Sequence, residues 1–502
     1  MLDANNLPEV QEDPDRRDLP FPLTSVQHAY WIGRTGAYSL GNVSSHIFFE
    51  FDNDCMDLGR LEQAWNMLVR RHEMLRAVFQ PEGTQRILET VPEYSFKIYD
   101  YRTIEQVESE ERLLAVRDEM STQLMQVETW PLFDIRAARY RGGNGDRIRL
   151  YMDFDSLIAD AWSIFLLMDE WHTLYKNLDA ALPEILLSFR DYVNAESKLK
   201  DCRQYSQDLE YWKNRLDSLP PPPELPLARQ PAEIEEVRTQ RRSAIIPAGK
   251  WKDIKKRLSR EGLSPSGLLV AVYAEVLARW SKSQHFTLNL TLFNRLPMHI
   301  DVDRVVGDFT SLALLEVDNR KGGSFIERAR NIQRQLWQDL NHRLVSGVDV
   351  LRELAAARKE PGMVMPVVFT GAVGLGASGR DGSSLANLGD MTFCLTQTPQ
   401  IWLDYQAYEQ DGALMLNWDA VEELFRPGVL DAMFAACTDL LERLAEGKAW
   451  TDATLVSVPD EQTQKRINGL AKPLSGKRLD TLFTEEAAKN PQALAVITSK
   501  RS

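Results

Sequence analysis

Cysteine and histidine are scarce in this sequence, which contains four cysteines and seven histidines among 502 residues. The cysteines are far apart and form no CxxC pair, so the sequence predicts neither a zinc knuckle nor a CxxC redox motif. No two histidines combine with a carboxylate at the spacing typical of a metal site. We therefore expect no metal, and a reducing, cytoplasmic setting. The cysteines are Cys55, Cys202, Cys394 and Cys437.

Long apolar runs and an excess of positive charge are also lacking. No run is long enough to cross a bilayer, and residues 1–20 have no apolar segment of the signal-peptide type. Asp and Glu outnumber Lys and Arg by 73 to 59, which gives a formal net charge of −14. Nucleic acids and anionic membranes need a basic surface. We therefore expect neither as a partner.

The composition is that of a globular protein, with 44% hydrophobic and 26% charged residues. A single core stops growing at roughly 250–300 residues, so we expect more than one lobe. Helical and strand-like patterns alternate, which indicates an α/β fold. Helices are predicted over 61–79, from 160 onward, over 264–280 with Ser264 as N-cap, and over about 427–444. Strands are predicted at 148–154, 286–292, 365–369, 401–408 and 414–418, and a loop over 371–390.

Proline-rich and polar stretches divide the chain into four predicted segments. Residues 1–20 form an extended leader, and residues 21–200 form an N-terminal lobe. The run Leu219–Leu227 contains five prolines and cannot be a helix or a central strand, so we interpret it as part of a connector. It belongs to a C-terminal lobe at 201–455, and residues 456–502 follow as a polar linker and a further segment.

Two aspartates and a serine form the pattern DxxxxDxxS at Asp155, Asp160 and Ser163. Asp160 precedes a helical pattern and is expected to cap that helix, while Asp155 is expected to pair with an arginine, Arg295. Ser163 would lie in the first helical turn, and no histidine in the segment could activate it as a nucleophile. We therefore favour a structural role for all four residues.

Several segments, taken in order, resemble the motif set of heterocyclization domains of nonribosomal peptide synthetases, which belong to the condensation-domain superfamily. In ordinary condensation domains HHxxxDG stands where this chain has DxxxxDxxS. Residues 478–502 are similar to the beginning of an adenylation domain that is then cut off. The matching segments are 21–34, 71–76, 155–163, 219–227, 307–310, 366–370, 397–404 and 417–419.

The resemblance implies two chloramphenicol-acetyltransferase-like lobes arranged as a V, with a tunnel between them. It also implies condensation of an acyl group with carrier-bound Cys, Ser or Thr, followed by loss of water to give a thiazoline or oxazoline. Upstream and downstream peptidyl carrier proteins would supply the phosphopantetheine arms beside a neighbouring adenylation domain. No bound cofactor is implied.

The resemblance assigns catalysis to Asp404 with Thr370 as partner, and substrate positioning to Asn294 and Gln397. From residue type alone, Asp404 would be an exposed acid at a strand end, and Thr370 could equally be an ordinary strand residue. The alternative for Asn294 is that it is a loop residue whose side chain hydrogen-bonds its own backbone. The motif context favours the catalytic interpretation of Asp404.

The sequence departs from the family pattern at two places beside the expected chemistry. Gly371 stands where the family usually has serine, and Leu395-Thr396 stands where Ile-Ser is common. Two other functions remain open. One is an amide-forming condensation domain that never cyclizes, which the missing HHxxxDG disfavours. The other is a noncatalytic carrier-docking module, which an intact Thr370 and Asp404 disfavour.

Overall fold

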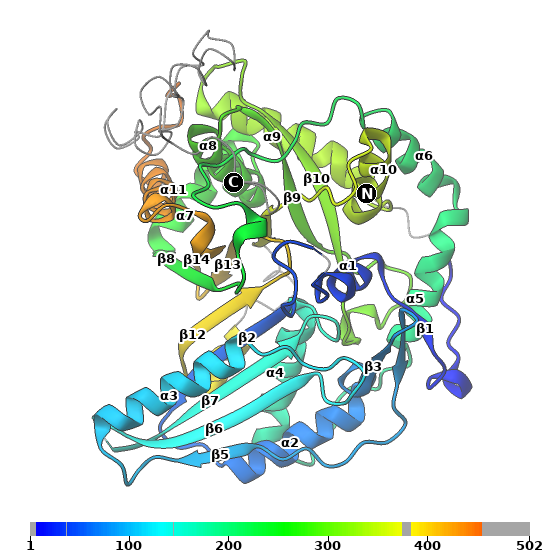
Figure 1. Cartoon of the computed structure of the whole chain (residues 1–502), viewed down its shortest axis with the longest axis vertical. Helices are drawn as coiled ribbons and strands as arrows, with labels where there is room; N and C mark the ends of the chain where they lie inside the picture. Colours follow the sequence, from blue (N-terminus) through cyan, green and yellow to red (C-terminus); the bar gives the residue numbers. More distant parts are fainter. Residues whose placement is uncertain (1–6, 37, 144, 374–382, 454–502) are drawn as a thin grey trace, which may run out of the picture. The chain divides into compact units, whose positions relative to one another are not determined.

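The computed structural model describes residues 7–36, 38–143, 145–373 and 383–453. The chain divides into two compact units, Met1–Val456 and Ser457–Ser502. The second unit, with the expected beginning of an adenylation domain, lies outside the described residues. All structural statements below concern the first unit, whose path is drawn in Figure 1.

A five-stranded sheet forms the centre of the N-terminal lobe, in the order β12-β2-β7-β6-β5. Helices cover both faces. Met152 faces α2 and α4, whereas its neighbour Tyr151 packs under α3, because successive side chains of a strand point to opposite faces. The elements are β2 (His46–Asn53), β5 (Lys97–Asp100), β6 (Phe133–Gly142), β7 (Gly145–Asp155), β12 (Asp390–Gln397), α2 (Leu58–Arg71), α3 (Gln106–Ser121) and α4 (Ala161–Lys176).

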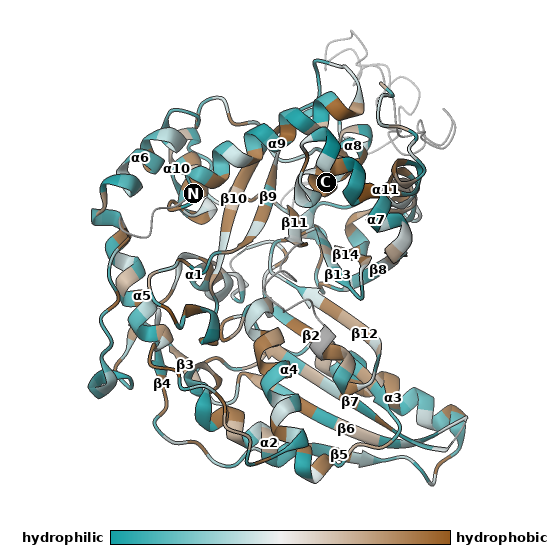
Figure 2. Cartoon of the chain, turned by 180° about the vertical axis from the view of Figure 1, so that it is seen from behind, coloured by the Kyte–Doolittle hydropathy of each residue, from teal (hydrophilic) through white to brown (hydrophobic). Residues whose placement is uncertain are grey.

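A six-stranded sheet forms the C-terminal lobe, in the order β10-β9-β11-β13-β14-β8. Its apolar strands β9 and β10 are largely brown in Figure 2, while the outer helix α9 carries polar stretches. The elements are β8 (Thr239–Ile246), β9 (His285–Phe293), β10 (Thr310–Asp318), β11 (Val367–Ala372), β13 (Leu403–Gln410), β14 (Ala413–Val421), α7 (Ala248–Glu261), α8 (Pro265–Trp280), α9 (Phe325–Asn341) and α11 (Val429–Ala445).

The buried helix α8 confirms the prediction for 264–280. The Ser264 side chain accepts a hydrogen bond from the backbone N–H of Gly267 at 3.0 Å, and Pro265 occupies the first turn, where its missing N–H costs nothing. Apolar residues surround α8 on most sides because α7, α9, α11 and the sheet all pack against it. The predicted pairing of 401–408 with 414–418 is also confirmed, as the antiparallel pair β13–β14.

Strand β12 joins the two lobes. It follows most of the C-terminal lobe in the sequence, yet it pairs antiparallel with β2, and Gln397 lies opposite His46. Figure 1 shows β12 in yellow beside the blue β2. Residues 374–382, which precede it within the predicted loop at 371–390, lie outside the described residues. The described part of that loop includes the end of β11 and a 3-10 helix, Ser383–Leu388.

Shorter elements complete the described part of the chain. The helix predicted over 61–79 ends at Arg71, because His72 adopts an extended backbone and its ring bonds Glu170 at 2.8 Å. Among the described helices, none has the length and apolarity needed to cross a bilayer. The remaining elements include β1 (Phe21–Pro22), β3 (Ala77–Gln80), β4 (Thr84–Ile87), α1 (Ser25–Gly33), α5 (Phe189–Ser197), α6 (Arg203–Lys213) and α10 (Gly347–Arg358).

Candidate active site

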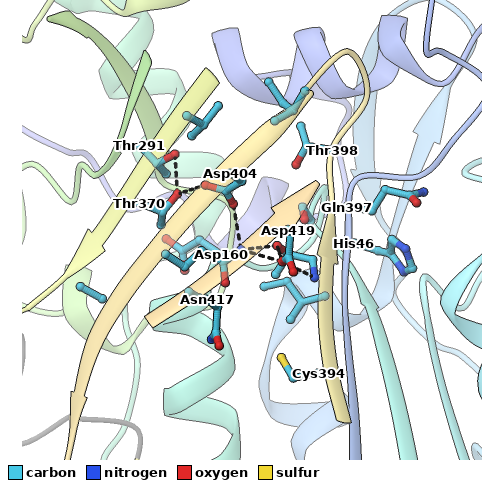
Figure 3. A pocket seen from close by; sticks show the side chains of 18 of the residues that line it. His46, Asp160, Thr291, Thr370, Cys394, Gln397, Thr398, Asp404, Asn417 and Asp419 are labelled. Carbon is cyan, nitrogen blue, oxygen red and sulfur yellow. Dashed lines mark hydrogen bonds between the residues drawn. The ribbon is translucent and has the colours of Figure 1, made fainter. Parts of the chain in front are cut away.

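A cavity opens over one face of the six-stranded sheet and is closed by β2, β12, α1 and α4. The side formed by the sheet is polar. Alternate residues of a strand point to the same face, so the polar residues of neighbouring strands line the cavity together. Its other side is mostly apolar. The polar side includes Arg241, Thr291, Thr370, Asp404, Gln406, Asn417 and Asp419, and the apolar side includes Ile47, Phe49, Ile164, Phe165, Leu385 and Met391. Figure 3 shows the polar group from close by.

Asp404 and Thr370 form a hydrogen-bonded pair at this cavity. Their strands β13 and β11 are parallel neighbours, and the Thr370 hydroxyl lies 3.0 Å from Oδ1 of Asp404. The same hydroxyl lies 3.1 Å from the hydroxyl of Thr291 on β9. Each threonine hydroxyl can donate one hydrogen bond and accept another. Thr291 can therefore donate to Thr370, and Thr370 to Asp404.

Burial raises the pKa of Asp404 to about 6, since the surrounding protein disfavours the charged form. Hydrogen bonds from Gln406 and Thr370 act in the opposite direction, and the negative charge of Asp419 adds to the increase. The side chain is half-buried and borders the cavity. A carboxyl group with this pKa can take and return a proton near neutral pH.

A second acid, Asp419, lies opposite Asp404 on β14 and is held by a buried ion pair. Arg241 of β8 donates to both oxygens of Asp419, at 2.7 and 2.5 Å, and the side chains are 9% and 2% exposed. The amide nitrogen of Gln406 lies 2.8 Å from Oδ2 of Asp404 and 3.0 Å from Oδ2 of Asp419. Gln406 therefore connects the two acids.

Asp160 has the predicted capping role. It is the N-cap of α4, and its Oδ1 accepts the backbone N–H of Ser163 at 2.7 Å. Arg295 also donates to this Oδ1, at 3.0 Å, and to the Ser163 hydroxyl, at 2.8 Å. The serine in turn donates to the Gly307 carbonyl and accepts its N–H, so this group ties α4 to the segment before β10.

The predicted pairing of Asp155 with Arg295 is wrong. Arg295 pairs with Asp160, whereas Asp155 accepts from Arg34 at 2.5 Å. Asp155 ends β7 and Arg34 follows α1, so this buried pair fastens α1 to the N-terminal sheet. The two aspartates of the motif thus hold different elements.

Of the two predicted substrate-positioning residues, only Gln397 lines the cavity. It ends β12, and its Oε1 accepts from the Thr239 hydroxyl at 3.4 Å. Asn294 instead borders a second, more polar pocket, with Ser25, Glu196 and Asp349. Thr310 lines both pockets, so the two spaces are neighbours.

The polar cavity residues without a predicted role include Thr291, Arg241, Gln406 and Asp419. The alternation along β13 and β14 would have placed Gln406 beside Asp404, and Asp419 beside Asn417, on one face of each strand. No sequence signal makes β8 the neighbour of β14, which brings Arg241 to the site. In the part of the chain that the structure describes, no three His, Cys, Asp or Glu residues are grouped to hold a metal ion.

The comparison with protein-family models gives a match to the condensation domain over residues 21–466. The match covers most of the chain, including both lobes and the cavity. The chain belongs to the condensation-domain family. This result confirms the expected superfamily. Of the two aspartates and the serine of DxxxxDxxS, Asp160 lines the cavity.

Curated relatives of this condensation domain are much longer than the chain. It is 38% identical over 492 residues to phenyloxazoline synthase MbtB of Mycolicibacterium paratuberculosis, and 96% of the chain covers 41% of that protein. It is 36% identical over 497 residues to pyochelin synthetase PchF of Pseudomonas aeruginosa, where 97% of the chain covers 26%. The chain therefore corresponds to a part of each relative.

Among solved structures, the chain is similar to the cyclization-docking bidomain of the nonribosomal peptide synthetase EpoB from Sorangium cellulosum. The TM-score is 0.82 at 38% identity, with 89% of each chain covered. The expected fold, two chloramphenicol-acetyltransferase-like lobes arranged as a V, is thereby confirmed.

The two departures from the family pattern have different physical meanings. A Cβ atom at Gly371 would lie 2.7 Å from the ring of Phe369, so serine there would require the ring to move. Thr396 retains the hydroxyl of the usual serine and donates it to Oδ2 of Asp419 at 2.6 Å. The second departure therefore preserves a polar contact, and the first leaves room for the Phe369 ring next to Thr370.

Proposed function

We propose that this chain is a heterocyclization domain. It joins an upstream acyl group to a carrier-bound Cys, Ser or Thr and then closes a thiazoline or oxazoline ring with loss of water. The observation that supports it best is the hydrogen-bonded pair of Thr370 and Asp404 at the shared cavity, with a carboxyl group whose pKa is about 6.

Ring closure needs a base and then an acid, and one carboxyl group can serve as both in turn. Ionised Asp404 takes the proton of the substrate thiol or hydroxyl as its sulfur or oxygen bonds the amide carbonyl carbon. Protonated Asp404 then gives this proton to the departing oxygen. As the C=N bond forms, the carboxylate, ionised again, takes the proton of the amide nitrogen and passes it to the hydroxyl group, which leaves as water. Thr370 orients the carboxyl group through its hydrogen bond to Oδ1.

The substrates arrive on partners. We propose that upstream and downstream peptidyl carrier proteins deliver them on phosphopantetheine arms, and that residues 456–502 lead into an adenylation domain. We retain the division into 21–200 and 201–455 as the two lobes, with the exception that β12 of the second segment completes the sheet of the first lobe. A cytoplasmic location accords with the four free thiols.

The test is a reaction of the chain with two loaded carrier proteins, followed by intact-protein mass spectrometry of the downstream carrier. The expected product has the mass of the amide minus one water. Amide alone would identify a condensation domain without cyclization. An unmodified carrier across a panel of acyl groups and all three nucleophilic amino acids would favour a docking module.

The dehydration step should depend on pH. Because Asp404 must be ionised to act first as a base, the rate of water loss is expected to increase with pH and to be half-maximal near pH 6. Amide formation does not use this carboxyl group, so its pH–rate profile should lack this rising limb. Rapid-quench samples between pH 5 and pH 8 measure both steps, and a water-loss rate that is flat across this range would contradict the assignment.

Replacing Thr370 with valine should slow dehydration about tenfold or more while leaving the amide step largely intact. Valine has a similar shape but offers no hydroxyl, so Oδ1 of Asp404 loses its 3.0 Å partner. The ratio of dehydrated product to amide measures the effect. Thr392→Val is a matched control, because that threonine is exposed and contacts Glu50 outside the cavity.

A further inference from the structure

The side-chain amide of Gln406 has a single possible orientation. Its Oε1 accepts a hydrogen bond from the Nη2 of Arg241 at 3.0 Å, and its Nε2 faces the carboxylates of Asp404 and Asp419 at 2.8 and 3.0 Å. A flipped amide would place an oxygen against two carboxylates and an NH₂ group against a guanidinium. The charges around Gln406 therefore fix which end faces Asp404.

The support behind Gln406 is rigid. Arg241 is bound to Asp419 through two parallel hydrogen bonds, a geometry with strong orientational preference. Asp419 also accepts the backbone N–H and the hydroxyl of Thr396, at 3.1 and 2.6 Å. The amide nitrogen of Gln406 also contacts this hydroxyl, so one of its two N–H groups is shared between two acceptors. Three strands, β8, β14 and β12, thus hold the amide in place.

The contacts of Asp404 differ between its two oxygens. Oδ2 accepts an N–H from Gln406, a donor that cannot accept a proton in return. Oδ1 faces the Thr370 hydroxyl, which can both accept and donate. A proton on Oδ2 would meet an N–H, whereas a proton on Oδ1 meets an oxygen lone pair. The exchangeable proton is therefore favoured on Oδ1, on the Thr370 side.

We propose that Gln406, held by the Arg241–Asp419 pair, is a positioning residue for ring closure that directs the exchangeable proton of Asp404 to Oδ1. The proposal rests on the function proposed above. Gln406 does not exchange a proton itself and acts only through Asp404. Its loss should therefore affect dehydration and spare amide formation.

The test compares Gln406→Met with wild type in the two-carrier reaction, with both products followed across pH. Methionine fills similar space without a donor. We expect amide formation within about twofold of wild type and dehydration slower by about 10- to 100-fold. The pH limb of dehydration should move upward, because the hydrogen bond that favours ionised Asp404 is gone. A purely structural role would slow both steps and leave the limb in place.

Two further variants complete the experiment. Gln410→Met changes the same residue type on the same strand outside the cavity and should match wild type. Gln406→Glu keeps the shape but adds a third carboxylate, and should move the limb at least as far upward. The Gln406→Glu variant also tests the role of Gln406 if the methionine variant does not fold. If folded Gln406 variants show the wild-type ratio of dehydrated product to amide and the wild-type pH profile, the role of Gln406 is overturned and the proposed function stands. If the wild-type chain yields only amide, the proposed function is overturned as well.

Discussion

Asp404→Asn should retain amide formation and lose water elimination by about 10²- to 10⁴-fold, the usual contribution of a general acid–base group. Asparagine has nearly the same shape and can still bond Thr370 and Gln406, so the strands should keep their arrangement. It cannot exchange a proton near neutral pH. The expected result is accumulation of uncyclized amide on the downstream carrier, read by intact-protein mass.

The matched control for this variant is Asp411→Asn, at the turn between β13 and β14 and outside the cavity. Asparagine tolerates the left-handed backbone that Asp411 adopts, with φ of 50°. The control should give dehydrated product at the wild-type rate. Dehydrated product at that same rate from Asp404→Asn would remove the carboxyl group from the mechanism.

Asp160→Ala should destabilise the chain by about 3–5 kcal/mol, the usual cost of leaving one member of a buried ion pair without its partner. Loss of an N-cap alone would cost about 1 kcal/mol. The larger value is expected because Arg295, 5% exposed in its side chain, would lose its only carboxylate contact among the described residues. Denaturant unfolding followed by fluorescence measures the difference.

Asp160→Asn separates the two contributions. Asparagine can still accept the Ser163 N–H, so the cap is retained while the charge is lost. We expect a stability between those of wild type and the alanine variant. Since Asp160 also borders the cavity, an alanine variant of unchanged stability that forms no product would indicate a chemical role instead.

The helix cap within the DxxxxDxxS motif could be predicted from sequence, whereas the arginine partners of its two aspartates could not. A cap involves residues three positions apart, so Asp160 and Ser163 reveal it directly. The arginine partners lie 121 and 135 residues away, and nothing in composition or spacing distinguishes Arg34 from Arg295. Only the packing of α1 on the N-terminal sheet decides between them.

The pair of Asp404 and Thr370 shows a similar division. Residue type alone favoured an exposed acid at position 404, and the motif resemblance was needed to assign it a catalytic role. Its supporting group, Gln406 with Asp419 and Arg241, depends on the order of strands β13, β14 and β8. Alternation predicts which side chains share a face of one strand, but it does not predict which strand lies next to it.

The pairing of β12 with β2 has a consequence for anyone who divides this condensation domain into parts. A fragment ending near residue 200 would keep β2 but lack its outer neighbour, and would expose unpaired backbone N–H and C=O groups along His46–Asn53. Such open edges favour aggregation. During synthesis on the ribosome, the first sheet also stays incomplete until β12 has emerged, more than 200 residues after β7. Cuts outside residues 21–453 are therefore better than a cut between the lobes.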